Sequence, residues 1–370
     1  ISLEKKSSED VSDFKGSDYE VLNSMKDLVR VIDKDGVIIF ANTSMIKSMP
    51  INPIGVNCYL DYSEDFPKCL ADRKYRLNST IKEKRKINGV DYSITSSPVM
   101  DKDGEVISTV EVFRDISKEV KTQIDLINAN KDIKDEIKFA KHIQSKTLPS
   151  KGEHVGLDLD YSYISSRDLS GDIIDCIDID ERFVGIYIAD VVGHGIAASI
   201  LTMFIRQTMR YLVSRITDSR PKRVLKDLNT TFTELNLSVD KYFTIFYGLY
   251  DRKLKIFSYA NAGHNGIPFL ISNDKLEELK VTGHPISPMF EGVGFDQRDI
   301  LVSSGDELIM YTDGITETRG FDNEFYGEER LKRDLMKVPD RRIEYVLNEL
   351  NSFRFLEQDD DIVLVSLKVL

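Results

Sequence analysis

The pattern of apolar and polar positions divides the chain into four segments. Residues 1–18 are polar with few apolar anchors, so we expect a poorly ordered tail. Residues 19–115 contain short apolar runs separated by Asp-Gly and Asn-Gly turns, which is typical of antiparallel strands. Residues 116–149 repeat apolar positions every three or four residues, as an amphipathic helix does. Residues 150–370 return to strand-like runs separated by helical stretches, and the predicted fold class is α+β.

The first folded segment is predicted to hold a hairpin at Val29–Asn42, with an Asp-Gly turn, and three further strands. These strands are Tyr75–Ile87, Val90–Val99 and Val106–Asp115. The order opens on "VIDKDGVIIFAN", closes on "VFRDIS" and resembles a PAS sensor domain of α/β type. The resemblance implies a signal-binding pocket or a dimerisation module, and a packed domain without any ligand stays open. Residues 1–115 contain no His, which excludes histidine-ligated haem within them.

The linker 116–149 is predicted to be a helix with one apolar stripe. Its positions are Ile116, Val120, Ile124, Ile127, Ile133, Ile137, Ala140 and Ile143. A stripe this long needs a partner, so we expect a coiled-coil homodimer through this helix. The alternative is that the helix folds back on its own domains. Because it joins two domains, we also expect it to carry regulation between them.

The last segment is predicted to contain several strands and helices. The predicted strands are 158–164, 170–179, 183–189, 242–250, 254–259, one within Ile300–Tyr311, and 361–369. The predicted helices are 195–213, 221–237, 327–337 and 341–353. Helix 195–213 is apolar on most of its circumference and is expected to be buried against a sheet, although Arg206 and Arg210 interrupt it.

Acidic residues stand at the ends of four of these strands. Asp172 and Asp190 are equidistant from a polar break at Glu181, so a hairpin centred there would place them opposite each other. Opposed carboxylates repel, and we expect something positive between them. Asp313 ends another apolar run, and Asp360 lies in the acidic cluster before the last strand. Taken singly, such residues are also common as helix caps and turn residues.

Composition excludes several classes of function. The formal charge of −12 argues against nucleic-acid binding, which needs a basic face. No apolar run reaches the length of a transmembrane helix, so we expect no membrane segment. Cys58, Cys69 and Cys176 form no close pair, and neither a disulfide framework nor a zinc motif is indicated. A reducing, cytoplasmic location fits this pattern.

Five motifs in residues 150–370 resemble, as an ordered set, one enzyme family. They are Ser-Gly-Asp (170–172), Asp-Val-Val-Gly-His-Gly (190–195), Ala-Gly-His-Asn (262–265), Tyr-Thr-Asp-Gly (311–314) and Asp-Asp-Ile (360–362). This order resembles the metal-dependent protein Ser/Thr phosphatases of type 2C, in the bacterial branch of the sporulation stage II E and stress-response regulators. The resemblance implies a β-sandwich flanked by α-helices.

The resemblance also implies a centre for two Mn²⁺ or Mg²⁺ ions that activate water for attack on a phosphoserine or phosphothreonine. Its ligands would be Asp172, Asp190, Asp313, Asp360 and the Val191 carbonyl, with Asp190 bridging the ions. Whether Asp360 or Asp361 is the fourth carboxylate stays open at this point. An all-carboxylate set, without clustered His or Cys, favours these hard ions over Zn²⁺.

Three other polar residues near the motifs are ambiguous. Arg167, five residues before Asp172, is a candidate phosphate clamp or a solvated charge. His194 and His264 are expected to shape loops and are not assigned as ligands.

The resemblance implies a substrate as well, namely a phosphorylated regulatory protein of the anti-anti-sigma type. Two alternatives to this function remain. One is a catalytically silent sensor and scaffold, and the other is a metal-dependent nuclease or small-molecule phosphatase. Its net acidity weighs against a nuclease.

Overall fold

The computed structural model describes residues 16–58, 70, 79–193, 195–215, 219–355 and 357–370. The chain divides into two compact units, residues 1–132 and 133–370. The division falls within helix α3 (Ser117–Thr147), which therefore contributes to both units. The disorder expected for residues 1–18 lies almost wholly outside the described residues, and helix α1 begins at Gly16.

The N-terminal unit is built on an antiparallel sheet with the strand order β2-β1-β5-β4-β3. Its elements are α1 (Gly16–Ser24), β1 (Leu28–Asp33), β2 (Ile38–Ala41), α2 (Thr43–Ser48), β3 (Ile81–Ile87), β4 (Val90–Met100) and β5 (Val106–Asp115). The predicted hairpin at Val29–Asn42 is confirmed, with Gly36 in the turn at φ 86°. Residues 71–78, which include the start of the expected strand Tyr75–Ile87, lie outside the described residues.

The C-terminal unit contains two antiparallel sheets, of order β14-β11-β10-β9-β8 and β13-β12-β15-β16-β7-β6. The first sheet comprises β8 (Asp172–Asp178), β9 (Phe183–Val191), β10 (Phe243–Asp251), β11 (Ile256–Ala262) and β14 (Arg298–Leu301). The second comprises β6 (Gly152–His154), β7 (Leu157–Ile164), β12 (Phe269–Ser272), β13 (Lys275–Glu278), β15 (Glu307–Tyr311) and β16 (Ile362–Val369). The helices are α4 (Ile196–Arg215), α5 (Pro221–Thr233), α6 (Asp313–Thr316), α7 (Gly327–Leu335) and α8 (Arg342–Phe353).

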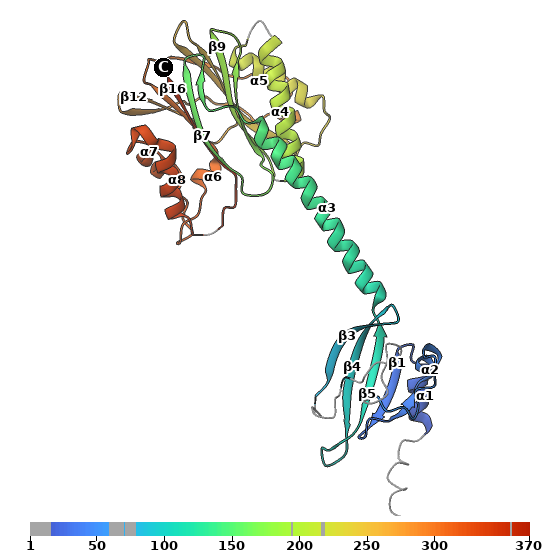
Figure 1. The fold of residues 1–370 in the computed structure, drawn as a ribbon. Coiled ribbons are helices and arrows are strands. Elements are labelled where there is room, and N and C mark those ends of the chain that lie inside the picture. The colour runs from blue at the N-terminus through green and yellow to red at the C-terminus, as the bar shows by residue number, and fades with distance from the viewer. Residues whose placement is uncertain (1–15, 59–69, 71–78, 194, 216–218, 356) are drawn as a thin grey trace, which may run out of the picture. The chain divides into compact units, whose positions relative to one another are not determined.

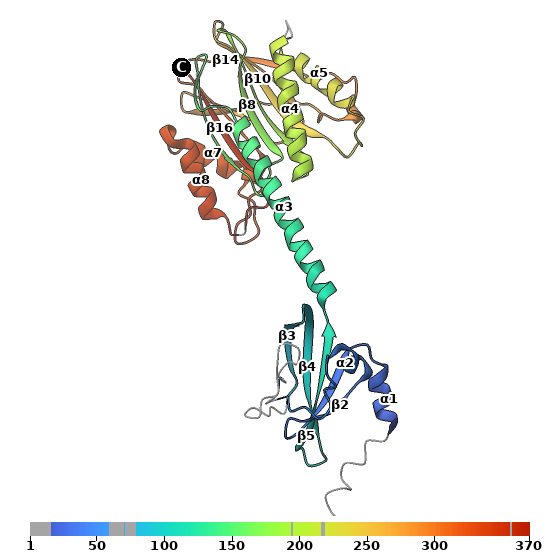
Figure 2. The ribbon, with the colours of Figure 1, turned by 45° about the vertical axis from the view of Figure 1, so that its right-hand side comes forward.

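The two sheets pack face to face, and helices cover their outer faces (Figures 1 and 2). Apolar side chains of both sheets, such as Ile186, Phe246 and Val365, form the core between them. A second core joins the first sheet to α4 and α5, and a third joins the second sheet to α6, α7 and α8. Strands with one face in each of two cores are apolar on both faces, which explains the continuous apolar runs in the sequence. The sandwich flanked by helices is therefore confirmed.

Helix α4 differs in part from the expectation of a buried helix. Ile205 and Met209 are buried against the first sheet, but Ile196 is 54% exposed and Ile200 is 62% exposed. The expectation of burial is therefore wrong for one face of the first turns of α4, although Ala198 on another face is buried. When apolar residues surround most of a helix, the sequence does not show which face packs against the sheet.

The arginines that interrupt α4 have a structural role. Arg210 donates two hydrogen bonds, of 2.6 and 2.7 Å, to the fully buried carboxylate of Asp175 on β8. The Arg206 guanidinium lies 3.6 Å from the same carboxylate. A buried charge needs such a partner, so these cations fix α4 against β8.

Some boundaries differ from the predicted ones. The run Ile300–Tyr311 is divided by a turn at Gly305 between two strands, β14 and β15, that belong to different sheets. The hairpin β12–β13 was not predicted. Its two-residue turn, Asn273-Asp274, has positive φ at both positions, as the hairpin turns that match strand twist require. Helix α5 starts at Pro221 as predicted and ends earlier, at Thr233.

Within the described ranges, none of the helices combines the length and the apolar character needed to span a bilayer.

Candidate active site

Asp172 and Asp190 lie directly opposite each other across β8 and β9, as the hairpin symmetry predicted. Asp172 is the first residue of β8 and Asp190 the penultimate residue of β9. Asp172 is only 3% exposed, and its Oδ2 atom has no hydrogen-bond partner among the described residues. A buried carboxylate oxygen without a partner is costly, so this strand end favours a bound cation.

Burial and mutual repulsion also raise the pKa values of the two carboxyl groups. Burial, then the charges of Asp190 and Asp361, hold the pKa of Asp172 well above its usual range. Burial, together with the charges of Asp313 and Asp360, raises the pKa of Asp190 to about 7. Without a cation the cluster therefore retains protons near neutral pH.

Asp313 and Asp360 reach this cluster from the second sheet. Asp313 is the first residue of α6, two residues beyond the end of β15, and Asp360 lies two residues before β16. Partial burial and the charge of Asp313 raise the pKa of Asp360, while the Asp361 N–H, which donates to its carboxylate, opposes the rise. The four aspartates that the sequence singled out thus act on one another electrostatically.

Both carboxylate oxygens of Asp361, the alternative fourth ligand, are hydrogen-bonded to the loop before β8. Its Oδ1 accepts hydrogen bonds from the N–H of Ser166, at 2.7 Å, and from the Ser166 hydroxyl, at 3.0 Å. Its Oδ2 accepts from the Ser170 hydroxyl, at 2.7 Å, and the Gly171 N–H, at 2.8 Å. Asp360 is exposed as a residue although its carboxylate is partly shielded, and it accepts a hydrogen bond from the Asp361 N–H, so its oxygen atoms are less occupied, which favours Asp360 as the ligand.

The backbone of the Gly171 segment leaves room for a carbonyl ligand. A Cβ on Gly171 would lie 3.1 Å from the carbonyl oxygens of both Val191 and Gly193. The absence of a side chain there keeps the Val191 carbonyl approachable. Gly193 and Gly195 have φ values of 93° and 81°, which explains the glycines of this turn.

The remaining candidates have different positions. His264 is buried, and its Nε2 donates to the Tyr311 carbonyl at 3.0 Å, in agreement with a role in holding a loop. Arg167 is exposed between β7 and β8, next to Ser166, which bonds Asp361. His194 lies outside the described residues.

Several residues near the cluster were not singled out by the sequence. Burial and the charges of Asp313 and Asp360 raise the pKa of Glu317, which lies four residues after Asp313 at the end of α6. The Asn265 side chain donates to Asp313 at 3.5 Å. The spacing of four residues between Asp313 and Glu317 was the available signal, since it places both on one helix face.

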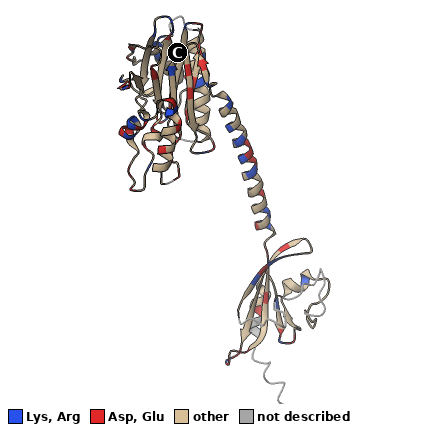
Figure 3. Cartoon of the chain, turned by 60° about the vertical axis from the view of Figure 1, so that its left-hand side comes forward, with Lys and Arg blue, Asp and Glu red and all other residues tan. Residues whose placement is uncertain are grey.

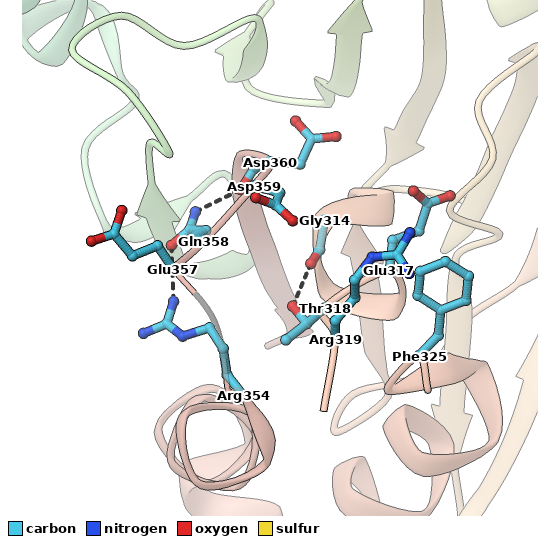
Figure 4. Close-up of a pocket in the computed structure, with 10 residues that line it drawn as sticks. All are labelled: Gly314, Glu317, Thr318, Arg319, Phe325, Arg354, Glu357, Gln358, Asp359 and Asp360. Carbon is cyan, nitrogen blue, oxygen red and sulfur yellow. Dashed lines mark hydrogen bonds between the residues drawn. The ribbon is translucent and has the colours of Figure 1, made fainter. Parts of the chain in front are cut away.

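Asp360 also borders a cavity of about 180 Å³ (Figure 4). Its walls include Glu317, Phe325 and two cations, Arg319 and Arg354. Arg354 donates to the Gln358 side chain at 3.3 Å, and Gln358 donates to the Asp360 carbonyl at 2.7 Å. The cavity thus has two guanidinium groups among its acidic walls, beside the aspartate cluster.

The donor set fits a hard divalent cation, because it consists of carboxylate and carbonyl oxygens. Within the described residues, however, no three of the four carboxylates bring oxygen atoms within 4.8 Å of one another. A bound cation would offset the repulsion between these carboxylates and draw their oxygen atoms together.

The sequence of the C-terminal unit is similar to that of known proteins. Residues 180–370, slightly more than half of the chain, match the family model described as stage II sporulation protein E (SpoIIE). The phosphoserine phosphatase RsbU of Bacillus subtilis is 28% identical over 244 residues, which cover 64% of this chain and 71% of RsbU. The phosphoserine phosphatase RsbP of the same organism is 30% identical over 189 residues, which cover 50% of this chain and 46% of RsbP.

A solved structure shares the fold of the C-terminal unit. The SiaA-PP2C domain of Pseudomonas aeruginosa aligns with a TM-score of 0.57 at 19% identity, and the alignment covers 65% of this chain and 98% of that domain. At this identity the likeness concerns the fold.

The crowding of carboxylates predicts an unusual pH dependence of stability. A carboxyl whose pKa is higher in the folded state holds its proton better there, so its contribution to stability is lost as the pH rises through the folded pKa. In chelator, metal-free wild type should lose about 1 to 3 kcal/mol relative to Asp190→Asn between pH about 4.5 and about 7.5. Denaturant unfolding of both proteins at the two pH values measures this difference.

Addition of Mn²⁺ should restore the stability of the wild type at the higher pH and have little effect on the stability of Asp190→Asn. A difference between the two proteins that does not change with pH would show that Asp190 ionises without strain.

Proposed function

Because this chain belongs to the SpoIIE family and is a PP2C-type protein serine/threonine phosphatase, we propose that it hydrolyses phosphoserine or phosphothreonine with the help of two divalent metal ions. The observation that carries the proposal is the opposition of Asp172 and Asp190 across β8 and β9, with a buried oxygen that lacks a partner. A cation is the simplest compensation for that arrangement.

The residues that would hold the ions are Asp172, Asp190, Asp313, Asp360 and the Val191 carbonyl. Bound Mn²⁺ or Mg²⁺ would supply an activated water and neutralise charge on the phosphoryl group. Asp190, opposite Asp172 and under the influence of Asp313 and Asp360, is the residue best placed to be shared between two ions.

Other residues of the chain would position these ligands and the substrate. Asp361 holds the Ser166–Gly171 loop to the start of β16, and so fixes Asp172 relative to Asp360. Arg167, exposed in that loop, is the proposed phosphate clamp, since a guanidinium binds phosphate oxygens in pairs.

The proposed substrate is a phosphorylated regulatory protein of the anti-anti-sigma type. Support comes from the motifs of residues 150–370 and from the two relatives named as phosphoserine phosphatases. The chain covers less than half of RsbP, so a shared substrate is part of the proposal. A silent scaffold is the competing function, and it predicts a protein without turnover.

We further propose that the N-terminal unit is a PAS-like sensor. The support is its antiparallel sheet with strand order β2-β1-β5-β4-β3, preceded and flanked by the short helices α1 and α2. Helix α3 would carry the signal to the phosphatase domain.

One side chain of α3 is bonded directly to the loop that carries Asp172. Gln144 is buried, and its side chain bonds the backbone of Ser170 in both directions. It donates to the Ser170 carbonyl at 2.9 Å and accepts from the Ser170 N–H at 3.1 Å. It also donates to the Thr202 hydroxyl of α4 at 3.3 Å. A movement of α3 would therefore displace the segment just before Asp172.

The first prediction from this function concerns the metal. Removing divalent ions with a chelator, or replacing Asp190 by Ala, should lower phosphate release from a phosphoserine protein more than about 100-fold. Loss of a residue that only supports a metal ligand typically costs about 10- to 100-fold, and loss of the ligand itself should cost more. Asp359→Asn, at an exposed neighbour of Asp360, is the matched control and should keep its activity.

Assay of generic phosphate esters beside the phosphoprotein separates a protein phosphatase from a small-molecule phosphatase. Full turnover in chelator, or by Asp190→Ala, would contradict the metal mechanism, and no turnover under any metal would favour the scaffold.

The second prediction concerns the Gln144 contact. Gln144→Leu should lower the Mn²⁺ concentration that gives half-maximal rate by about 5-fold or more, a typical size for coupling between sites. The reason is that Gln144 holds Ser170, two residues before Asp172, in an arrangement in which no three of the four described carboxylates bring oxygen atoms within 4.8 Å of one another. Gln123→Leu, at an exposed position of the same helix, is the control. Identical metal dependence in all three proteins would refute control through this contact.

The third prediction concerns pairing of α3 in a homodimer. Apolar residues of this helix remain exposed, and Figure 3 shows acidic and basic residues interspersed along it. The exposed apolar residues are Ile124, Leu126, Ile127, Ile133, Phe139 and Ile143.

Sedimentation equilibrium should give a mass of twice the chain mass of 42.3 kDa for the wild type. The double variant Ile127→Glu, Ile133→Glu should sediment as a monomer, because charges replace two apolar contacts of the paired helices. Lys131→Glu is the control. A monomer at micromolar wild-type concentrations would contradict pairing.

A further inference from the structure

A second group of metal-ligating side chains lies at the other end of β8. Among the described residues, one set of three His, Cys or acidic side chains has its ligand atoms all within 4.8 Å of one another, namely His154, Cys176 and Asp178. Asp172 begins β8 and Asp178 ends it, so the strand separates the two sites by roughly 20 Å. The second group therefore does not belong to the aspartate cluster.

The fold brings these three residues together from two sheets. His154 is the last residue of β6, at the edge of the second sheet, and β8 is the edge strand of the first. Cys176 and Asp178 are two residues apart on β8, so their side chains point to the same face. That face is the one that packs against the second sheet, because Cys176 belongs to the core between the sheets.

Hydrogen bonding orients the His154 ring towards the other two residues. Its Nε2 lies 2.8 Å from the Ser150 carbonyl oxygen, which accepts only, so Nε2 must carry a proton. Its Nδ1 lies 3.1 and 3.2 Å from the two carboxylate oxygens of Asp178. A carbonyl that binds one ring nitrogen and leaves the other for a cation is the usual support of a metal-bound histidine.

With the Nε2 proton held by the Ser150 carbonyl, a contact between Nδ1 and the Asp178 carboxyl group needs a proton or a metal ion between them. The nearby buried Cys176 thiol distinguishes this group from an ordinary histidine–aspartate pair.

Cys176 is a buried free cysteine, and its sulfur lies close to the ligand atoms of both His154 and Asp178. A metal ion binds the thiolate form of cysteine, and its binding releases the thiol proton.

We propose that His154 Nδ1, Cys176 Sγ and a carboxylate oxygen of Asp178 bind one divalent ion of the zinc class. Sulfur and imidazole donors select Zn²⁺ over Mg²⁺ and Mn²⁺, which the all-oxygen cluster at the other end of β8 prefers. The Asp178 side chain is 50% exposed, so water has access to complete a tetrahedral site.

The position of the site gives the ion a structural role. Ser150 and His154 follow directly after α3, whose last residue is Thr147. An ion shared by β6 and β8 would join the edges of the two sheets at the place where α3 enters the sandwich. It would thereby hold the end of the linker helix to the domain that Gln144 also contacts.

Cobalt binding tests the proposal independently of phosphatase activity. The probe is Co²⁺, added to the full chain in a Cys58→Ser, Cys69→Ser background in which Cys176 is the remaining cysteine of the three. A thiolate ligand gives a sulfur-to-cobalt charge-transfer absorption in the near ultraviolet, which carboxylate sites do not produce. We expect this band to saturate at one equivalent and to disappear when Zn²⁺, the stronger binder, is added.

Four further variants complete the test. Cys176→Ser should abolish the band, while His154→Gln and Asp178→Asn should weaken Co²⁺ binding by about 10- to 100-fold. Asp190→Asn should leave the band intact, because it alters only the oxygen cluster. Absence of the band in the background protein would overturn the proposal and leave His154 and Asp178 as a hydrogen-bonded pair without a metal. A band that survives in both His154→Gln and Asp178→Asn would overturn it as well.

Discussion

Two like charges that face each other across neighbouring strands are the constraint on which the rest of the site depends. Asp172 and Asp190 occupy one register position of the β8–β9 pair, where an apolar or oppositely charged pair would be the stabilising choice. The sandwich supplies the stability that this arrangement requires, through three apolar cores on the faces of its two sheets. The cost is concentrated at the end of the sheet, where loops from both sheets add further carboxylates.

Hydrogen bonds hold together the segments that surround the repelling carboxylates. Asp361 accepts four hydrogen bonds from Ser166, Ser170 and Gly171, and so ties the start of β16 to the loop before β8. Gln144 of α3 binds the backbone of that same loop, and the Arg210–Asp175 pair fixes α4 to β8. The start of β16, helix α3 and helix α4 are therefore each hydrogen-bonded either to β8, which carries Asp172, or to the loop just before it.

Much of this could be predicted from the sequence, because the informative features are local. The symmetry of Asp172 and Asp190 about Glu181 placed them opposite each other, and continuous apolar runs indicated strands buried on both faces. Features that depend on distant segments could not be predicted. The preference for Asp360 over Asp361 as the proposed ligand rests on the bonds of Asp361 to Ser166 and Gly171, almost two hundred residues away. His154 and Cys176 likewise show no sequence motif, since they come from different sheets.

The most direct test of the central claim, that strand-end aspartates of two sheets hold a pair of divalent ions, is a crystal structure of the full chain grown with Mn²⁺. Anomalous scattering would locate the ions without assumption about their ligands. The account predicts two manganese peaks beside Asp190, within bonding distance of Asp172, Asp313 and Asp360. Crystals that hold Mn²⁺ elsewhere and leave these four carboxylates without an ion would contradict it.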